Sequence, residues 1–175
     1  MMQPQGYEPG PVTRFLAEDH RRLERLLRTS VGSTGRVMQG TYEHFRAGLL
    51  RHIGMEEKIL LPAAQRWNGG RPISIAAKLR LDHGALAALL MPTPTTDILA
   101  TLHRILGQHN LLEEGPDGWY EICDRLAGAD VEQLITRLCA TPDVAVLPHS
   151  DTPAVLGAVH RALERAGYTL GSDFR

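Results

Sequence analysis

The chain has 175 residues, a formal net charge of −1 and an apolar fraction of 43%. That apolar fraction is enough for a buried core and the length fits one domain, so the composition excludes a globally disordered chain. The near-neutral charge gives no reason to expect nucleic acid or an anionic membrane as a partner. No apolar run is long enough to cross a bilayer, and the N-terminus lacks the basic start and apolar core of a signal peptide. The two cysteines are interpreted as reduced thiols, and we expect a cytoplasmic protein.

Residues 1–12 are rich in proline, glycine and glutamine, which predicts a loose N-terminal tail. A helix is expected to begin near residues 11–13 and to end near Ser30. One face of this helix repeats at steps of four and three residues, which is the spacing of a face that packs in a helical bundle. The face consists of Leu16, His20, Leu23 and Leu27. Residues 31–35 (VGSTG) predict a turn after the helix.

Residues 36–67 predict the second helix, and its buried face follows the same spacing. That face consists of Phe45, Leu49, His52, Glu56, Ile59 and Ala63. His52 and Glu56 are four residues apart, so their side chains lie one above the other on the buried face. Pro62 is expected to kink this helix or to start a new turn. The sequence NGGRP at residues 68–72 ends it.

Residues 73–91 and 95–114 predict a second pair of helices, separated by two prolines. The buried face of the third helix consists of Ala76, Leu79, His83, Leu86 and Leu90, and that of the fourth of Leu99, Leu102, Leu106, His109 and Glu113. A Gly-Pro pair interrupts the fourth helix, and a helix is expected to resume over residues 117–127.

The two helix pairs repeat one pattern. In each pair, an Asp-His dipeptide lies in the first helix and a His-x-x-x-Glu-Glu sequence lies in the second. Two helical hairpins joined by a short loop are expected to form an up-down-up-down four-helix bundle. The sequence therefore predicts an all-α fold with this bundle over residues 13–127.

Residues 128–175 have no counterpart in the repeat and predict a C-terminal extension of short helices. Residues 130–139 and 152–166 show helical spacing, and an apolar run of four residues at 144–147 precedes Pro148. We expect this extension to pack on the bundle.

Six polar side chains occupy otherwise apolar helix faces: His20, His52, Glu56, His83, His109 and Glu113. Burying a carboxylate costs several kcal/mol unless something pairs with it. Four imidazoles and two carboxylates are more than one metal ion takes, but they suit two ions that share both glutamates. The nitrogen and oxygen donors fit iron, manganese or zinc. Without ions, the two glutamates are expected to face each other, which would raise the pKa of one of them.

The doubled pattern resembles the hemerythrin-like domain of the bacterial HHE cation-binding type, over residues 13–127. One His-x-x-x-Glu is weak evidence, but two of them, each preceded by an Asp-His in the partner helix, are specific. The resemblance implies two iron ions in a non-haem di-iron centre, with the four histidines as terminal ligands and Glu56 and Glu113 as bridges. The oxygen-carrying hemerythrins of invertebrates have a second histidine four residues from the third-helix ligand, but position 87 here is alanine. The resemblance therefore implies a more open coordination position, suited to sensing or redox chemistry rather than to oxygen carriage.

Other polar residues near these six receive secondary interpretations. Glu57 and Glu114 follow the bridging candidates by one residue, which rotates them by about 100°, so they are expected to support the ligands or to face solvent. Asp19 and Asp82 precede two of the histidines and are interpreted first as surface acids, with a role in holding an imidazole as the alternative.

The remaining histidines are interpreted as bystanders. His44 and His103 are expected to be exposed, and His149 and His160 to be structural. Tyr120 continues the buried face of the fourth helix and is interpreted as a core residue, although a phenol near iron can donate a hydrogen bond.

Two functions remain open at this point. The first is a metal-dependent protein that binds or senses O₂ or NO, or reports iron. The second is a di-iron oxidoreductase that acts on peroxide or NO, or in iron–sulfur centre repair. No flavin, haem or thiol motif is recognised that would supply electrons, which favours the first. A third hypothesis, a partner-binding module in residues 128–175, predicts that variants in the six residues keep their function, and it ranks last.

Overall fold

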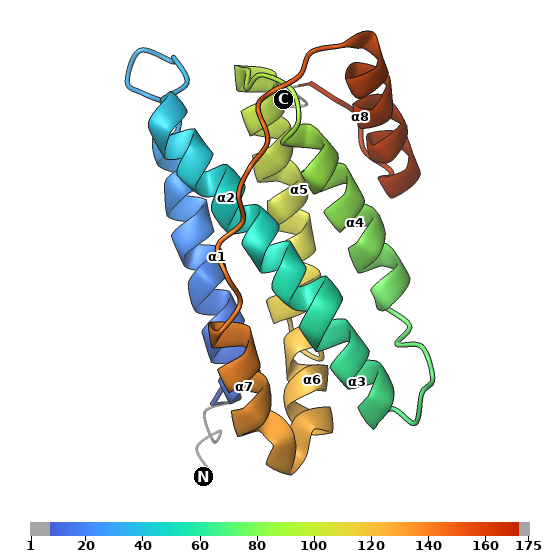
Figure 1. Ribbon diagram of the computed structural model, residues 1–175. Helices are drawn as coiled ribbons and strands as arrows, with labels where there is room; N and C mark the ends of the chain where they lie inside the picture. Colours follow the sequence, from blue (N-terminus) through green and yellow to red (C-terminus); the bar gives the residue numbers. More distant parts are fainter. Residues whose placement is uncertain (1–7, 172–175) are drawn as a thin grey trace, which may run out of the picture.

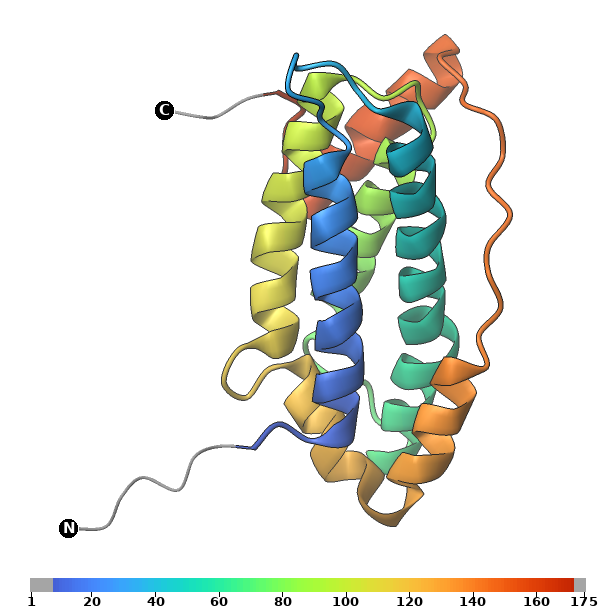
Figure 2. The same cartoon turned by 90° about the vertical axis from the view of Figure 1, so that its left-hand side faces the viewer.

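The computed structural model describes residues 8–171, and its regular structure there is helical (Figure 1). Within that range, strand pairing is limited to one isolated bridge between Val31 and Val37. Four helices form the bundle: α1 (Pro11–Thr29), α2 (Gln39–Met55), α4 (Ala76–Leu89) and α5 (Thr96–Glu114). Figures 1 and 2 show them side by side with alternating directions. The predicted all-α, up-down-up-down bundle is confirmed.

The predicted tail, residues 1–12, falls largely outside the described residues, because residues 1–7 are not among them. Its last two positions, Pro11 and Val12, are already the first turn of α1. Proline is well suited to that position because its missing N–H would have no helical partner there. The helix therefore begins at the early end of the predicted range.

The second predicted helix is continuous but not uniform. After α2 the chain makes a π-helical turn, Glu56–Leu60, and then continues as α3 (Leu61–Trp67). Pro62 lacks an N–H, and its ring would collide with the carbonyl four residues earlier in a regular α-helix. The wider turn relieves that collision, so the expected effect of Pro62 takes the form of a π-helical turn just before it.

A tight connection, residues 115–118, leads from α5 to α6 (Trp119–Ala127) beneath the bundle centre. A Cβ atom on Gly118 would lie 2.6 Å from the carbonyl oxygens of both Glu113 and Gly115, so only glycine allows this close approach. Asp124 of α6 then accepts hydrogen bonds from the backbone N–H groups of Val12 (2.8 Å) and Thr13 (3.0 Å). This carboxylate caps α1 and fixes α6 against the first helix.

The apolar core has two parts. One lies toward the end of the bundle near α8 and includes Leu27, Phe45 and Leu86, and the other lies toward α6 and includes Leu16 and Trp119. On α1, Leu16 belongs to one part and Leu23 to the other, with His20 between them in sequence. The predicted polar residues therefore form a layer between two apolar clusters.

The C-terminal extension packs along the outside of the bundle. It comprises a 3₁₀ turn (Gly128–Asp130), α7 (Val131–Cys139), an extended segment, and α8 (Pro153–Ala166), which lies against α4 (Figures 1 and 2). The extended segment runs alongside α2. The buried Arg46 of α2 donates hydrogen bonds to the carbonyl oxygens of Leu90 (2.7 Å) and, in the extended segment, Leu147 (2.6 Å). One side chain thereby joins the extension to the bundle.

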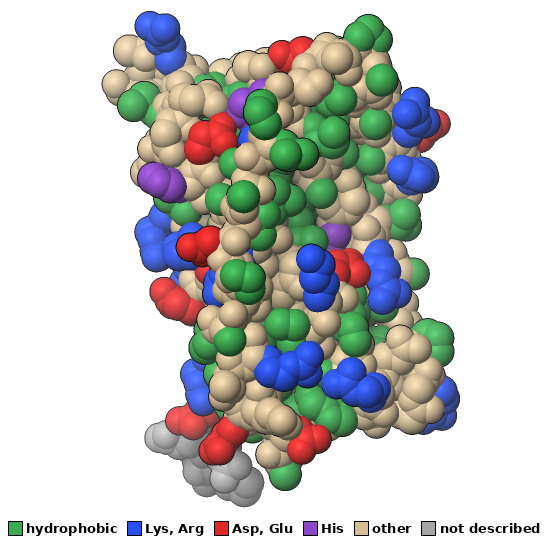
Figure 3. Space-filling view, in the orientation of Figure 1, with side chains coloured by type: hydrophobic (Ala, Val, Ile, Leu, Met, Phe, Trp, Pro, Cys, Tyr) green, Lys and Arg blue, Asp and Glu red, His purple; other side chains and the backbone are tan. Residues whose placement is uncertain are grey.

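The surface carries charges of both signs. On the face shown in Figure 3, Lys and Arg side chains are interspersed with Asp and Glu. Over residues 8–171, the helices are all too short or too polar to cross a membrane.

Candidate metal centre

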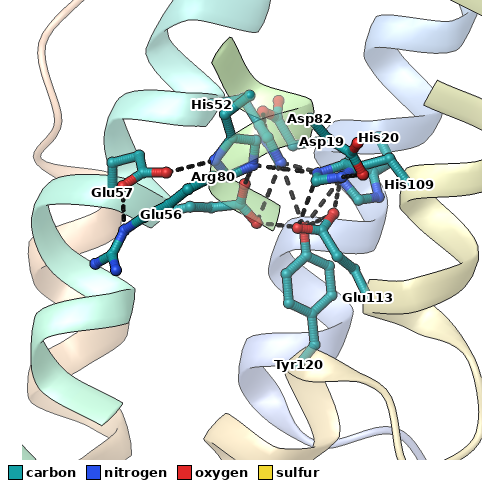
Figure 4. Close-up of polar contacts among 11 residues, drawn as sticks. Asp19, His20, His52, Glu56, Glu57, Arg80, Asp82, His109, Glu113 and Tyr120 are labelled. Atoms are coloured by element: carbon teal, nitrogen blue, oxygen red, sulfur yellow. Dashed lines mark hydrogen bonds and ion pairs between the residues drawn. The ribbon is translucent and has the colours of Figure 1, made fainter. Parts of the chain in front are cut away.

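All six residues predicted from the sequence meet in the middle of the bundle. α1 contributes His20, the last turn of α2 His52, the π-helical turn Glu56, α4 His83, and α5 both His109 and Glu113. Each is at most 5% exposed. Figure 4 shows the labelled members of this set pointing toward one another.

The donor atoms fall into two groups. The Nε2 atoms of His20 and His52 are 3.0 Å apart, and those of His83 and His109 are 3.1 Å apart. One group contains Glu56, His83, His109 and Glu113, and one donor atom of each lies within 4.8 Å of the others. The other group contains His20, His52 and again Glu113, within the same distance. The two histidine pairs therefore define two metal-sized groups.

Each glutamate divides its two oxygens between the groups. Glu56 directs Oε1 toward His52 Nε2 (3.7 Å) and Oε2 toward His83 Nε2 (3.0 Å). Glu113 directs Oε2 toward His20 Nε2 (3.3 Å) and Oε1 toward His109 Nε2 (3.1 Å). This is the arrangement in which a carboxylate can bridge two cations.

A carboxylate holds the outer nitrogen of every imidazole. The Nδ1 contacts are His20 with Glu114 (2.5 Å), His52 with Asp19 (2.9 Å), His83 with Glu57 (2.7 Å) and His109 with Asp82 (3.3 Å). A proton held on Nδ1 by a carboxylate leaves the Nε2 lone pair free to bind a metal, and it fixes the orientation of the ring. All four rings are thus oriented as metal-binding histidines are.

The first interpretation of Asp19 and Asp82 as surface acids is wrong. Asp82 is fully buried, and besides its contact with His109 it accepts a hydrogen bond from Lys78 Nζ (2.6 Å). The side chain of Asp19 is 12% exposed and is bound by Arg22 as well as by His52. Each aspartate precedes a ligand candidate on its own helix but holds the histidine of the next helix, a relation visible only in three dimensions.

The π-helical turn bears on the site because it contains both Glu56 and Glu57. One glutamate enters the bundle centre while its neighbour reaches the outer nitrogen of His83, with Arg80 on its far side (3.3 Å). Turns of this kind inside α-helices occur frequently at functional sites. Of the two predicted roles for Glu57 and Glu114, support of the histidines is the one observed.

Without an ion, the four imidazoles stabilise the negative charge of the two central glutamates. Burial favours a higher pKa for both glutamates, yet the surrounding imidazoles outweigh it, so the pKa of Glu56 falls well below its ordinary value and that of Glu113 is also lowered. Burial alone would lower the pKa of the histidines, but the carboxylates raise it to about 9 for His52 and to about 10 for His109. The expectation that repulsion would raise the pKa of one glutamate is wrong, because burial and the charge of Glu56 favour a higher pKa for Glu113 but the contacts with His109 and His20 outweigh both.

Two buried oxygens show that the donor set fits a cation. Glu56 Oε2 and Glu113 Oε1 are each about 3 Å from an imidazole nitrogen, but neither accepts a hydrogen bond from the described residues. A buried carboxylate oxygen that has only an ion-pair contact, without a well-directed hydrogen bond, is left partly unsatisfied. Both atoms face the His83 and His109 pair, where a bound cation would satisfy them.

The family model of the hemerythrin HHE cation-binding domain matches residues 12–117, more than half of the chain. The chain belongs to this family. Comparison with curated proteins and with solved structures gave no significant match. Family membership establishes cation binding as the general property of the domain, and the buried His/Glu cluster is a group that could hold a metal ion.

A cavity of about 390 Å³ lies between α1 and α5 and reaches His20 of this HHE centre. Its lining includes His20 and Glu114 on the side of the centre, and the rim includes Leu111, which is 73% exposed. The side chain of Glu114 keeps 32% exposure while it contacts His20. The cavity therefore approaches the centre on the side where Glu114 contacts His20.

The histidines interpreted as bystanders stay away from the centre. His44 and His103 are exposed, as predicted. His149 contacts Glu43 (2.6 Å), as expected of a structural residue. His160 is exposed on α8, so its structural interpretation is wrong.

Tyr120 plays a larger part than its interpretation as a core residue suggests. Its hydroxyl donates a hydrogen bond to Glu56 Oε1 (2.7 Å), and the ring is fully buried. Its spacing of seven residues from Glu113 predicts its place on the buried face, and the hydrogen bond is the alternative role expected of a phenol near iron.

Proposed function

We propose that this protein is a non-haem di-iron protein that binds or senses a small ligand such as O₂ or NO. The observation that carries the proposal is the division of both buried glutamates between two histidine pairs. Each pair then has two imidazole nitrogens and up to two carboxylate oxygens, which suits a divalent first-row metal. Iron is preferred over manganese or zinc because of the family resemblance.

An iron pair supplies, when bound, an open redox-active coordination position for a small ligand. The protein's own residues prepare that position. The outer carboxylates hold the four imidazoles in place, so the donors need little rearrangement on binding. The apolar clusters on either side exclude bulk water, and the cavity between α1 and α5 admits a small uncharged molecule.

The experiment is reconstitution with ferrous iron without oxygen, removal of unbound iron, elemental analysis, and titration with NO. We expect about two iron ions per chain and an iron–nitrosyl electron paramagnetic resonance signal that saturates stoichiometrically. His52→Ala should lose iron and the signal. The matched control is His44→Ala on the same helix, which should retain both. Failure of the wild-type chain to retain iron, or iron that does not respond to NO or O₂, would contradict the proposal.

The same samples separate binding from turnover. Stoichiometric reaction with O₂ or NO and negligible consumption of added peroxide supports a binding or sensing protein. Sustained consumption of peroxide that is lost in His52→Ala would assign the oxidoreductase function instead.

A further inference from the structure

The hydroxyl of Tyr120 has four donor atoms of the centre around it. Besides Glu56 Oε1, it lies 3.1 Å from Glu113 Oε2, 3.0 Å from His20 Nε2 and 3.3 Å from His52 Nε2. Figure 4 shows the side chain extending from α6 with its oxygen directed into the cluster. The hydroxyl donates its one proton to a glutamate and can accept hydrogen bonds from imidazole N–H groups, so it forms one cluster with these four donor atoms.

These distances are those of donor atoms that share one ion. Bonds from nitrogen or oxygen to a small divalent metal are about 2.1 Å long, so neighbouring donors at right angles around it lie about 3 Å apart. The hydroxyl keeps that distance from both histidine nitrogens and from one oxygen of each glutamate. It therefore lies at a distance expected of a further donor to an ion held by His20 and His52.

The other half of the centre lacks such an atom. Within residues 8–171, the group formed by His83 and His109 includes the two glutamates, and no side-chain hydroxyl makes a hydrogen bond with either Nε2 atom. One turn beyond His83 on the same helix face, the residue is Ala87, which has no donor atom. The two glutamate oxygens that accept no hydrogen bond from the described residues also face this half.

The position of Tyr120 is set by the fold rather than by its own flexibility. The Gly118 connection places it under the centre, and the capping of α1 by Asp124, four residues later, holds α6 in place. A donor held so firmly is suited to direct binding, because little conformational freedom is lost.

Resting on the proposed di-iron function, we propose that Tyr120 Oη binds the ion held by His20 and His52. The oxygen–metal bond forms as the phenolic O–H bond breaks, the proton leaves to solvent, and no electron is transferred. Tyr120 then gives this ion a phenolate donor that the ion held by His83 and His109 does not have.

The test is the visible absorption and resonance Raman spectrum of the ferric-loaded protein. Wild type should show a tyrosinate-to-iron charge-transfer band with enhanced phenolate ring vibrations. Tyr120→Phe should lose the band and these vibrations while retaining about two iron ions. The control is Tyr42→Phe, because Tyr42 is equally buried, its hydroxyl has no partner among the described residues, and it lies in the core part away from α6. This variant should keep the wild-type spectrum.

The outcomes separate this inference from the proposed function. A wild-type protein that holds two iron ions but shows no tyrosinate band overturns the role of Tyr120 and leaves the di-iron function standing. A band that survives in Tyr120→Phe also overturns it. Failure of the wild type to hold iron overturns both. The wild-type spectrum decides the matter even if Tyr120→Phe folds poorly.

Discussion

His20 and His52 come from the first helical hairpin, and His83 and His109 come from the second. Each pair brings two Nε2 atoms to about 3 Å, and each is supported by one aspartate of its own hairpin, Asp19 or Asp82. The hairpins also exchange support. Glu57 of the first holds His83, and Glu114 of the second holds His20.

The halves differ where a third element enters. Tyr120 of α6 reaches only the first pair, and the cavity between α1 and α5 also touches that half through His20. The second half is more enclosed, since Asp82 is fully buried and paired with Lys78. The repeated hairpin therefore supplies the symmetric arrangement of the four histidines, whereas Tyr120, outside the repeat, makes the two histidine pairs chemically different.

The largest effect is expected from removing a shared carboxylate. Glu56→Ala takes a donor from both halves, so we expect the iron content to fall from about two ions per chain to well below one. Elemental analysis after reconstitution measures this. Glu57→Ala is the matched neighbour, because it removes only the support of His83.

For Glu57→Ala, we expect about two ions at saturating iron but an affinity weaker by about 10- to 100-fold for one of them. Equal losses of iron in both variants would mean that Glu56 is not shared between the halves.

The second prediction concerns the metal-free protein and pH. The folded-state pKa values of His52 and His83 are raised to about 9 by their carboxylates, although burial opposes this, while the unfolded value is about 6.5. A raised pKa stabilises the fold fully below the unfolded value and loses that contribution as pH rises through the folded value. We expect the melting temperature without metal to fall by roughly 5–10 °C between about pH 6 and pH 9.

The metal-loaded protein should change much less over that range, because metal binding already requires unprotonated Nε2 atoms. The gap between loaded and metal-free melting temperatures should therefore widen as pH rises. Thermal melts of both forms at the two pH values measure it. A metal-free protein that becomes more stable toward pH 9 would contradict the observed pairing of imidazoles with carboxylates.

A third prediction compares the two supporting aspartates. Asp19→Asn and Asp82→Asn should each weaken metal affinity by about 10- to 100-fold, because each leaves one imidazole poorly oriented. Asp82→Asn should also cost more stability, since it leaves the ammonium of Lys78 without its buried partner. Metal titrations and melts of the two variants give both quantities. A larger loss of stability in Asp19→Asn would reverse the assignment of the enclosed half.

The smallest effect is expected at the cavity. Gly107 of α5 lines it, and a Cβ there meets no described atom within 4 Å. Gly107→Leu should fill part of the cavity and slow the association of NO several-fold, with iron content unchanged. Gly84→Leu is the control, because Gly84 is also an exposed helical glycine with open space around its Cβ. Equal association rates in the two variants, measured by stopped flow, would exclude this route.

The sequence predicts much of this molecule because its strongest signal is periodic. The face that contains Leu16, His20 and Leu23 identifies a buried helix side, and the same spacing on four helices brings all six polar residues to one layer. The sequence does not predict the burial of Asp82, because its imidazole partner, His109, lies on the next helix. The π-helical turn at Glu56 and the tight connection at Gly118 depend on local backbone geometry, and the position of Tyr120 depends on both α5 and α6. Such features follow from packing between elements rather than from the spacing within one.

We propose that two ions bind side by side and share Glu56 and Glu113. Anomalous X-ray scattering at the iron edge, from crystals of the reconstituted protein, tests it most directly. Two peaks are predicted in the bundle centre, one at the Nε2 atoms of His20 and His52 and one at those of His83 and His109, each also in contact with both glutamates. A single peak, or peaks away from these residues, would contradict a pair of ions that share the two glutamates.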